Sequence, residues 1–408
     1  MNDYEHIVDL EARYLLQTYS RYPVALAKGR GVYVWDVEGR KYLDFVGGLG
    51  VNALGHAHPK IVKAIREQAA RAIHFSNLYY NEFQGKLAKR LCELSGLDRA
   101  FFSNSGTEAI EGAIKVARAA GHAVGGDAKS KLVALAGSFH GRTFGALSLT
   151  GQEKYRKTFE PMLEGVTFVK REDVEALRAA VNDDTCAIVM ETIQGEGGIR
   201  ECSAEYLREV RELATKHRAA LILDEIQCGV GRTGTMFAYQ QKGIVPDIVT
   251  IAKPIAAGLP LGAFVAKEEF ARAITAGKHG TTFGGGPLAC RVALEVLAVM
   301  EQERLMERVQ RVGNYMHSLF EGLVRDFAGL ALEARGTGMI QALELSVPAR
   351  PIVDAALAEG LLLNVTQEKV LRFLPPYLLE EKHADKLGRF LRKSLKAVPK
   401  QQTAAVGS

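Results

Sequence analysis

A lysine at the end of an apolar run is the first residue in this sequence that could do chemistry. The segment 248–252 is apolar apart from one threonine, and Lys253 follows it directly. A cation at the end of a buried strand either extends its amine to water or uses that amine. When burial or a neighbouring cation lowers its pKa, a lysine amine becomes a nucleophile toward aldehydes and ketones. Taken alone, a strand-end lysine favours simple pairing with an acid, so a second signal is needed.

Asp224 supplies that second signal, because it ends another apolar segment, residues 221–223. Open α/β sheets bind ligands outside the carboxyl ends of their strands, so both side chains are expected at one sheet edge. An acid there is either a helix cap or a partner for a cation. The protonated ring nitrogen of pyridoxal phosphate is such a cation, and its aldehyde suits a lysine amine. Lys253 and Asp224 therefore match the two catalytic roles that a pyridoxal enzyme requires.

A phosphate site is the next requirement, and Ser105, Gly106 and Thr107 open an amphipathic helical pattern. Free N–H groups and the positive dipole end favour an anion at a helix N-terminus. The alternative is plain capping, because Ser105 and Glu108 have the spacing of a capping box. The segment alone supports both interpretations equally.

Three further side chains could contact a cofactor ring or a substrate carboxylate. Phe139 and Arg142 follow the apolar segment 131–137, and Arg372 interrupts an apolar run before a double proline. An aromatic side chain can stack on a pyridine ring, and arginine binds carboxylates through two parallel hydrogen bonds. Without other signals, Phe139 would be interpreted as a core residue and Arg142 as a surface residue.

A rival motif, Gly229-Val-Gly231-Arg-Thr-Gly234, matches the dinucleotide-binding pattern G-x-G-x-x-G. A lone match is weak evidence. No long helical pattern opens at its third glycine, and no acid lies about 20 residues further on, as the dinucleotide site requires. The sequence also has no P-loop, so nicotinamide chemistry is set aside.

Composition limits the other classes of function. The 408 residues are 47% hydrophobic, with a net charge of +5 that is scattered along the chain. No basic block or long apolar stretch is present, so neither nucleic acid nor a membrane is an expected partner. The first residues carry acids and predict no signal peptide. Five separated cysteines predict no disulfide framework and no metal site, and indicate a reducing, cytoplasmic location.

The elements that must position these residues alternate between helical patterns and short apolar strands from about residue 60 to 300. Continuously apolar strands indicate a sheet covered by helices on both faces, so the fold class is α/β with a mostly parallel sheet. One long helix is expected over residues 288–327, followed by a smaller α+β domain. The expected division is an N-terminal segment 1–50 packing with the small domain, a large domain 51–290, a small domain 291–397 and a flexible tail 398–408.

With these residues identified, the sequence resembles the class III pyridoxal-phosphate aminotransferases over nearly its whole length. Segments NLYYNE and FHGRT narrow the resemblance to the branch that acts on N-acetylornithine. The resemblance implies a fold-type I transferase and a homodimer with its active sites at the interface. It rests on VNALGHAHP, FSNLYYNEFQ, SNSGTEA, SFHGRT, ETIQGEGG, LILDEIQCGVGRTG, IAKPIAAGLPLGA and HGTTFGG, in this order.

The resemblance also implies a role for each site residue. Lys253 would hold the cofactor covalently and later move the substrate proton, and Asp224 would pair with the ring nitrogen. Arg142 and Arg372 would hold the two carboxylates of glutamate, and Glu196 would pair with one arginine when the substrate has only one carboxylate there. The remaining implied contacts are Ser105, Gly106 and Thr107 with the phosphate, Phe139 with the ring, Gln227 near the ring hydroxyl, Thr281 with the substrate, and Thr282 with the phosphate of the other subunit.

The implied reaction moves the terminal amino group of N-acetylornithine to 2-oxoglutarate, giving N-acetylglutamate semialdehyde and glutamate, in arginine biosynthesis. Alternatives within the same chemistry are succinylornithine, ornithine, succinyldiaminopimelate and other ω-amine transaminases. Two alternatives use no transamination: a decarboxylase or aldolase that forms a Schiff base with its lysine, and a non-catalytic scaffold protein. Three departures from the family pattern affect the substrate assignment: Gly286 for asparagine, Thr192 for proline, and Gly47-Gly48 for Ser-Gly.

Overall fold

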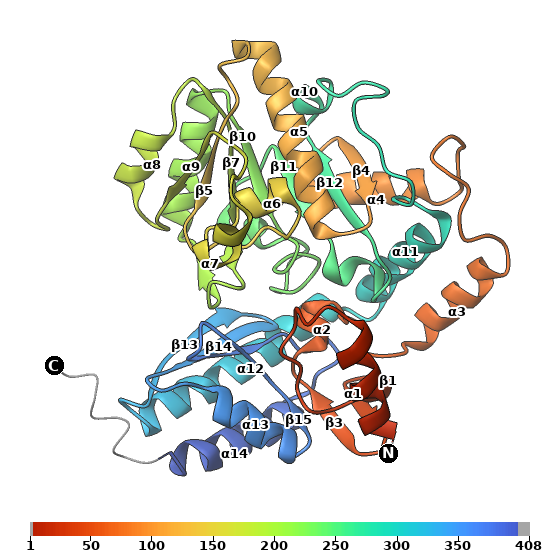
Figure 1. The fold of residues 1–408 in the computed structure, drawn as a ribbon, viewed down its shortest axis with the longest axis vertical. Helices are drawn as coiled ribbons and strands as arrows, with labels where there is room; N and C mark the ends of the chain where they lie inside the picture. Colours follow the sequence, from red (N-terminus) through yellow and green to blue (C-terminus); the bar gives the residue numbers. More distant parts are fainter. Residues whose placement is uncertain (1–2, 399–408) are drawn as a thin grey trace.

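A seven-stranded sheet forms the centre of the larger body in the computed structural model, which describes residues 3–398 (Figure 1). Five neighbouring strands run parallel, and β12 is antiparallel to both of its neighbours. The predicted α/β class with a mostly parallel sheet is confirmed. In sheet order the strands are β4 (Arg99–Ser103), β12 (Gly262–Ala266), β11 (Ile248–Ile251), β10 (Ala220–Asp224), β7 (Thr185–Glu191), β5 (Lys131–Leu135) and β6 (Val166–Val169).

Helices cover both faces of this sheet, which explains why its central strands are buried at every position. Within β10, Leu221 and Leu223 pack in the cluster that contains Leu207 of α9. The alternate residue Ile222 packs with Ile110 of α5 in a second cluster on the opposite face. The helices of this body are α3 (Pro59–Ala69), α4 (Gln84–Ser95), α5 (Gly106–Gly125), α6 (Phe144–Ser148), α7 (Glu153–Arg156), α8 (Val174–Ala180), α9 (Ala204–Lys216), α10 (Glu268–Ala271) and α11 (Pro287–Gln302).

The chain's two ends contribute to the smaller body in Figure 1. One sheet has the order β13-β14-β17-β16, and another pairs the N-terminal hairpin with β15 through a parallel contact between Leu43 and Leu361. None of the helices within residues 3–398 is long and apolar enough to cross a lipid bilayer. The elements are α1 (Asp3–Tyr14), β1 (Leu26–Arg30), β2 (Tyr33–Asp36), β3 (Lys41–Asp44), α2 (Gly47–Gly50), α12 (Leu305–Asp326), β13 (Ala331–Thr337), β14 (Ile340–Leu345), α13 (Arg350–Ala358), β15 (Leu361–Leu362), β16 (Asn364–Thr366), β17 (Val370–Phe373) and α14 (Glu381–Lys396).

The long helix expected over residues 288–327 was wrong, because the structure has two helices there. α11 ends at Gln302 and α12 begins at Leu305. Between them Arg304 has a φ of 50°, a left-handed conformation that no α-helix can continue through. The hydrophobic periodicity runs through this break without a glycine or proline, so no local pattern indicates where the first helix ends. Residues 399–408 of the expected tail lie outside the described part of the chain.

The glycine-rich segment 229–234 is a packing element. Gly231 and Gly234 have φ values of 86° and 91°, which favour glycine. A Cβ at Gly231 would lie 2.4 Å from Cε of Met300, and one at Gly234 would lie 2.2 Å from Cγ of Gln310. The glycines therefore allow the loop to approach α11 and α12 closely, and no helix begins at the third glycine.

Arg232 lies at the centre of this loop and is fully buried, and no acid within residues 3–398 forms an ion pair with it. Its guanidinium donates hydrogen bonds to the carbonyl oxygens of Gly50, at 3.0 Å, Met339, at 3.2 Å, and Pro375. It also lies 4.5 Å from the centre of the Tyr377 ring. One side chain thus connects four segments that are far apart in the sequence.

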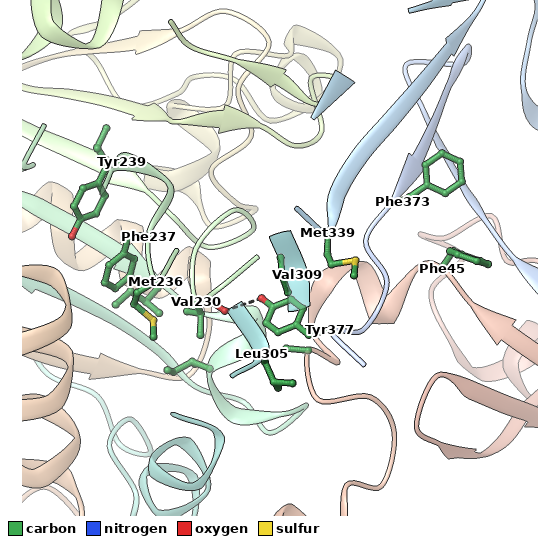
Figure 2. Packing of buried hydrophobic residues seen from close by; sticks show 14 of the residues in the cluster. Phe45, Val230, Met236, Phe237, Tyr239, Leu305, Val309, Met339, Phe373 and Tyr377 are labelled. Carbon is green, nitrogen blue, oxygen red and sulfur yellow. Dashed lines mark hydrogen bonds between the residues drawn. The ribbon is translucent and has the colours of Figure 1, made fainter. Parts of the chain in front are cut away.

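The Tyr377 ring lies within the surrounding core, where its hydroxyl donates to the carbonyl oxygen of Val230 at 2.7 Å (Figure 2). Leu305, Val309 and Met339 lie around the same ring (Figure 2). This packing joins the glycine-rich loop to the C-terminal part of the chain, which carries Arg372.

Replacing Arg232 with alanine is expected to destabilise the fold strongly. The change leaves three carbonyl oxygens without their donor, and each buried unsatisfied group costs about 1–3 kcal/mol. The thermal unfolding midpoint of Arg232→Ala, followed by circular dichroism, should lie well below that of the parent chain. Arg13→Ala is the control, because the Arg13 side chain is 65% exposed in a surface ion pair. Equal midpoints for the two variants would show that Arg232 does not connect these segments.

Candidate active site

A pocket of about 410 Å³ lies at the carboxyl end of the large sheet. The parallel register pairs Glu191 of β7 with Asp224 of β10, and Lys253 follows the next strand, β11. The structure therefore brings the strand-end acid and the strand-end lysine to one site. Of the residues predicted from the sequence, those lining the pocket are Ser105, Gly106, Thr107, Phe139, Arg142, Glu196, Asp224, Gln227 and Lys253.

The Lys253 side chain is partly buried, and its remaining surface faces the pocket. Burial lowers the pKa of Lys253, whereas the carboxylates of Asp224 and Glu196 oppose this shift. The net direction is downward, which increases the share of neutral, nucleophilic amine. The backbone at Lys253 has a φ of 36°, a left-handed conformation of the kind found at functional sites.

Three donors around Asp224 fix its carboxylate. Its Oδ1 accepts hydrogen bonds from the backbone N–H of Ile226 at 3.0 Å and from the Thr250 hydroxyl at 3.4 Å. Its Oδ2 lies 2.8 Å from Nδ1 of His140, which is fully buried. Burial alone would lower the pKa of His140, but the hydrogen bond and charge of Asp224 raise it overall. The contact with His140 and the N–H of Ile226 orient the Asp224 carboxylate, which lines the pocket.

Glu191 connects two loops that line the pocket. Its carboxylate accepts hydrogen bonds from the backbone N–H of Phe139 at 3.0 Å and of Gly195 at 3.1 Å. Burial raises the pKa of Glu191 to about 7. The sequence showed Glu191 at a strand end but indicated no role for His140. Glu191 contacts Phe139, and His140 contacts Asp224, over more than 50 residues of sequence, so neither contact was predictable from local pattern.

The N-terminus of α5 is capped by Ser105, but the reciprocal contact of Glu108 is with Asn104 and not with the N-cap residue itself. The Ser105 hydroxyl accepts a hydrogen bond from the backbone N–H of Glu108 at 3.4 Å, and the Glu108 carboxylate accepts one from the N–H of Asn104.

Thr107 joins the start of α5 to the loop of Arg142. Its hydroxyl accepts hydrogen bonds from the N–H groups of Arg142 and Thr143, both at 3.2 Å. The first N–H groups of a helix have no carbonyl acceptor within it, so those of Gly106 and Thr107 can bind an anion.

Arg372 reaches the site from β17 and is 3% exposed. It forms an ion pair with Glu196 at 2.6 Å and donates to Asn364 at 2.9 Å. Burial would raise the pKa of Glu196, but the charge and hydrogen bond of Arg372 lower it overall. Arg372 also approaches Oε1 of Gln227 at 3.4 Å, so it borders the pocket even though it does not line it.

Arg142 differs from Arg372, because it is exposed and has no carboxylate partner among residues 3–398. Its guanidinium carbon lies 5.5 Å from the centre of the Phe139 ring. A cation without an acid partner at the edge of a pocket is available to a substrate carboxylate.

Thr281 and Thr282 do not line the pocket of their own chain. They border a separate hollow of about 350 Å³, which also includes Asn104. The Nδ2 of Asn104 donates to the Thr281 hydroxyl at 3.3 Å, and Asn104 lines both the hollow and the pocket. The two threonines therefore lie on the surface next to the site.

All three departures from the family pattern lie outside the pocket lining. The Thr192 hydroxyl donates to the carboxylate of Glu225 at 2.9 Å, and both side chains are buried. Gly286 precedes the first turn of α11. The third departure, Gly47-Gly48, lies in α2, and a Cβ at Gly47 would lie 2.5 Å from the carbonyl oxygen of Leu374.

The residues of the pocket fit pyridoxal phosphate. The cofactor's phosphate matches the N–H groups at the start of α5, its ring nitrogen matches Asp224, and its aldehyde matches Lys253. A Cβ at Gly106 would lie 2.7 Å from Cδ1 of Ile226, so glycine keeps the phosphate end open. Within residues 3–398 no cluster of histidine, cysteine and acidic side chains could hold a metal ion. Pyridoxal phosphate is the cofactor of this site.

Comparison with known proteins supports the same conclusion. The family model of the class III aminotransferases matches residues 15–395. The chain is 48% identical to "Acetylornithine aminotransferase" of Methanocaldococcus jannaschii, over 94% of this chain and 96% of that protein. It is 43% identical to the protein of the same name from Aquifex aeolicus, over 94% of this chain and 100% of the relative.

Solved structures have the same architecture. The ornithine aminotransferase of Toxoplasma gondii superposes with a TM-score of 0.93 at 31% identity, covering 98% of this chain and 96% of that one. The acetylornithine aminotransferase of Elizabethkingia anophelis gives a TM-score of 0.87 at 31% identity, covering 97% and 100%. The chain belongs to the class III aminotransferases.

Proposed function

We propose that this protein transfers the terminal amino group of N-acetylornithine to 2-oxoglutarate, giving N-acetylglutamate 5-semialdehyde and glutamate in arginine biosynthesis. The observation that carries the proposal is the Lys253 amine, whose pKa is lowered in a pocket that also contains Asp224. Relatives named acetylornithine aminotransferase are 43–48% identical over about 94% of the chain. They support this donor more strongly than any other ω-amine.

When bound, pyridoxal phosphate supplies an aldehyde that accepts amino groups and a protonated ring that withdraws electrons from the substrate carbon. Lys253 would hold the cofactor through its amine, and the same amine would move the proton at the substrate carbon. Asp224 would pair with the ring nitrogen, and His140 holds Asp224 in place. The further contacts proposed are Ser105, Gly106 and Thr107 with the phosphate, Phe139 with the ring face and Gln227 near the ring hydroxyl.

The two arginines are proposed to bind the carboxylates of glutamate and 2-oxoglutarate. Arg142 takes one carboxylate, and Arg372 takes the other after Glu196 has moved aside. With N-acetylornithine, which has a single carboxylate, the 2.6 Å ion pair between Arg372 and Glu196 stays closed. One site thereby accepts two substrates of different charge.

The acids of the pocket favour an acylated donor over free ornithine. Free ornithine carries a second ammonium group next to its carboxylate, and such a group needs an acid. Glu191, Glu196 and Asp224 are the acids that line the pocket within residues 3–398. Each already has a partner, and within residues 3–398 no acid forms an ion pair with Arg142. An acetyl group removes the second positive charge, so the donor then matches the charges of the site.

A homodimer with sites at the interface is part of the proposal. The segments 73–81 and 281–285 are tied together by Asn77, which donates to the carbonyl oxygens of Thr281 and Gly284. Together they expose a large apolar surface beside the pocket, of the kind that marks a protein contact. Thr281 would line the substrate pocket, and Thr282 would reach the phosphate of the partner chain. The exposed apolar side chains are Ile73, Phe75, Leu78, Tyr79, Tyr80 and Phe283.

The division of the chain and its location are also proposed. The contact between β3 and β15 supports grouping segment 1–50 with the small domain 291–397, beside a large domain 51–290. All five cysteines are free, which supports a reducing, cytoplasmic location.

The visible absorption spectrum tests the cofactor chemistry. The purified protein should absorb visible light, and N-acetylornithine should bleach this absorption because its amino group passes to the cofactor, which is left in the pyridoxamine form. The Lys253→Ala variant should lose the absorption of the covalent link, and its turnover should fall by about a thousandfold or more. Lys131→Ala is the control, because the Lys131 side chain is 50% exposed. Unchanged turnover in Lys253→Ala would overturn the assigned role.

Steady-state kinetics test the donor. With 2-oxoglutarate as acceptor, kcat/KM for N-acetylornithine should exceed that for ornithine or 4-aminobutyrate by roughly tenfold or more, because the site lacks an acid for a second ammonium. N-succinylornithine and N-succinyldiaminopimelate complete the comparison. If kcat/KM is higher for any other donor, that donor replaces N-acetylornithine as the assigned substrate, and the family assignment is unaffected.

Subunit complementation tests the dimer. Lys253→Ala and Thr282→Glu chains should each form weakly active or inactive homodimers. Co-expression makes mixed dimers in which one site combines an intact Lys253 with an intact Thr282. Random pairing should then restore about a quarter of the parent activity. Light scattering confirms assembly, and a mixed dimer without recovered activity would show that Thr282 does not serve the partner's site.

A further inference from the structure

The environment of Arg142 contains an aromatic side chain that sequence reasoning did not single out. The guanidinium carbon of Arg142 lies 4.0 Å from the centre of the Tyr155 ring, closer than its 5.5 Å distance to the Phe139 ring. The two rings meet edge to face, with centres 6.0 Å apart and an interplanar angle of 83°. Arg142 therefore lies against two mutually packed aromatic rings.

We propose that Tyr155 is a positioning residue that holds Arg142 in the orientation that binds the substrate carboxylate. This inference rests on the proposed function, in which Arg142 takes a carboxylate of each substrate. It extends that function, because Tyr155 does not line the pocket and acts on it only through Arg142.

The physical reason lies in how a cation can be ordered without being neutralised. An arginine side chain has many rotamers, and ordering it during binding reduces affinity. An acid partner would order Arg142 but would compete with the substrate carboxylate. An aromatic face attracts the guanidinium and leaves its N–H groups free to donate. Tyr155 thus prepares Arg142 for an anion and does not have to be displaced when the anion arrives.

The position of Tyr155 is itself fixed from several sides. It lies in the short helix α7, beside Gln152, whose amide donates to the carbonyl oxygen of Gly137 at 3.4 Å. The Nε2 of Gln367 approaches Oε1 of Gln152 at 3.3 Å and donates to the carbonyl oxygen of Glu196 at 2.7 Å. The helix that carries Tyr155 is therefore tied to the loop of Glu196, which controls the other arginine.

Three variants test the proposal. In Tyr155→Leu the ring is lost, so KM for N-acetylornithine and for 2-oxoglutarate should rise about fivefold to thirtyfold while kcat changes little. Tyr155→Phe keeps the ring and should restore KM to within about twofold of the parent. Phe159→Leu is the matched control, because Phe159 is a half-exposed neighbour whose ring has no contact with Arg142.

Two further measurements separate positioning from general damage. A simple alkylamine donor lacks a carboxylate, so its kcat/KM should be equal in Tyr155→Leu and the parent. Calorimetry with glutarate, an unreactive dicarboxylate, should show a weaker Kd in Tyr155→Leu by the same factor as KM. The visible spectrum of the holoenzyme should not change, because the cofactor does not contact Tyr155.

The outcomes distinguish this proposal from the one it rests on. If Arg142→Gln leaves KM and the glutarate Kd unchanged, Arg142 does not bind a carboxylate and the proposed function loses that contact. If Arg142→Gln weakens both while Tyr155→Leu does not, the role of Arg142 stands and Tyr155 does not position it. If Tyr155→Leu impairs the alkylamine equally, Tyr155 supports the fold and not the arginine.

Discussion

The opposition between burial and charge at Lys253 is the interaction on which the rest of the site depends. Burial favours the neutral amine, whereas Asp224 and Glu196 favour the charged one, and burial prevails. The Asp224 carboxylate is buried beside this amine, and burying an acid is costly unless other groups form hydrogen bonds with it. His140 and the N–H of Ile226 provide those contacts. The site thus combines, within one pocket, a hydrogen-bonded acid and an amine whose pKa burial lowers.

The fold makes this arrangement possible through the register of its sheet. Parallel strands place Glu191 and Asp224 side by side, and the turn after β11 presents Lys253 at the same edge. Backbone N–H groups of distant loops then donate hydrogen bonds to these carboxylates. The same carboxylate oxygens therefore hold the loops in place and set the charge of the pocket. Glu191 illustrates this, because it holds both the loop of Phe139 and the loop that precedes Glu196.

The sequence predicted features that depend on local pattern. Apolar runs identified the strands and their polar end residues, and the start of α5 was visible in its capping residues. The partners that complete the site depend on tertiary contacts, so they were not predictable. His140 meets Asp224 across the sheet, and Tyr155 meets Arg142 through the packing of a four-residue helix. The family resemblance gave Arg372 its role, but its position beside Glu196 follows from how the smaller body packs against the larger one.

Three arginines in this protein show how the partner of a guanidinium decides what it can do. Arg232 is saturated by carbonyl oxygens in a closed core, so no ligand can reach it and it can only connect segments. Arg372 is paired with Glu196, so a ligand carboxylate would have to displace that acid before it could reach the guanidinium. Arg142 lies against aromatic rings, which do not occupy its N–H groups as an acid would. The site therefore combines one arginine that has no ion-pair partner among residues 3–398 with one that is already paired to an acid, and this arrangement suits an enzyme whose two substrates differ by one carboxylate.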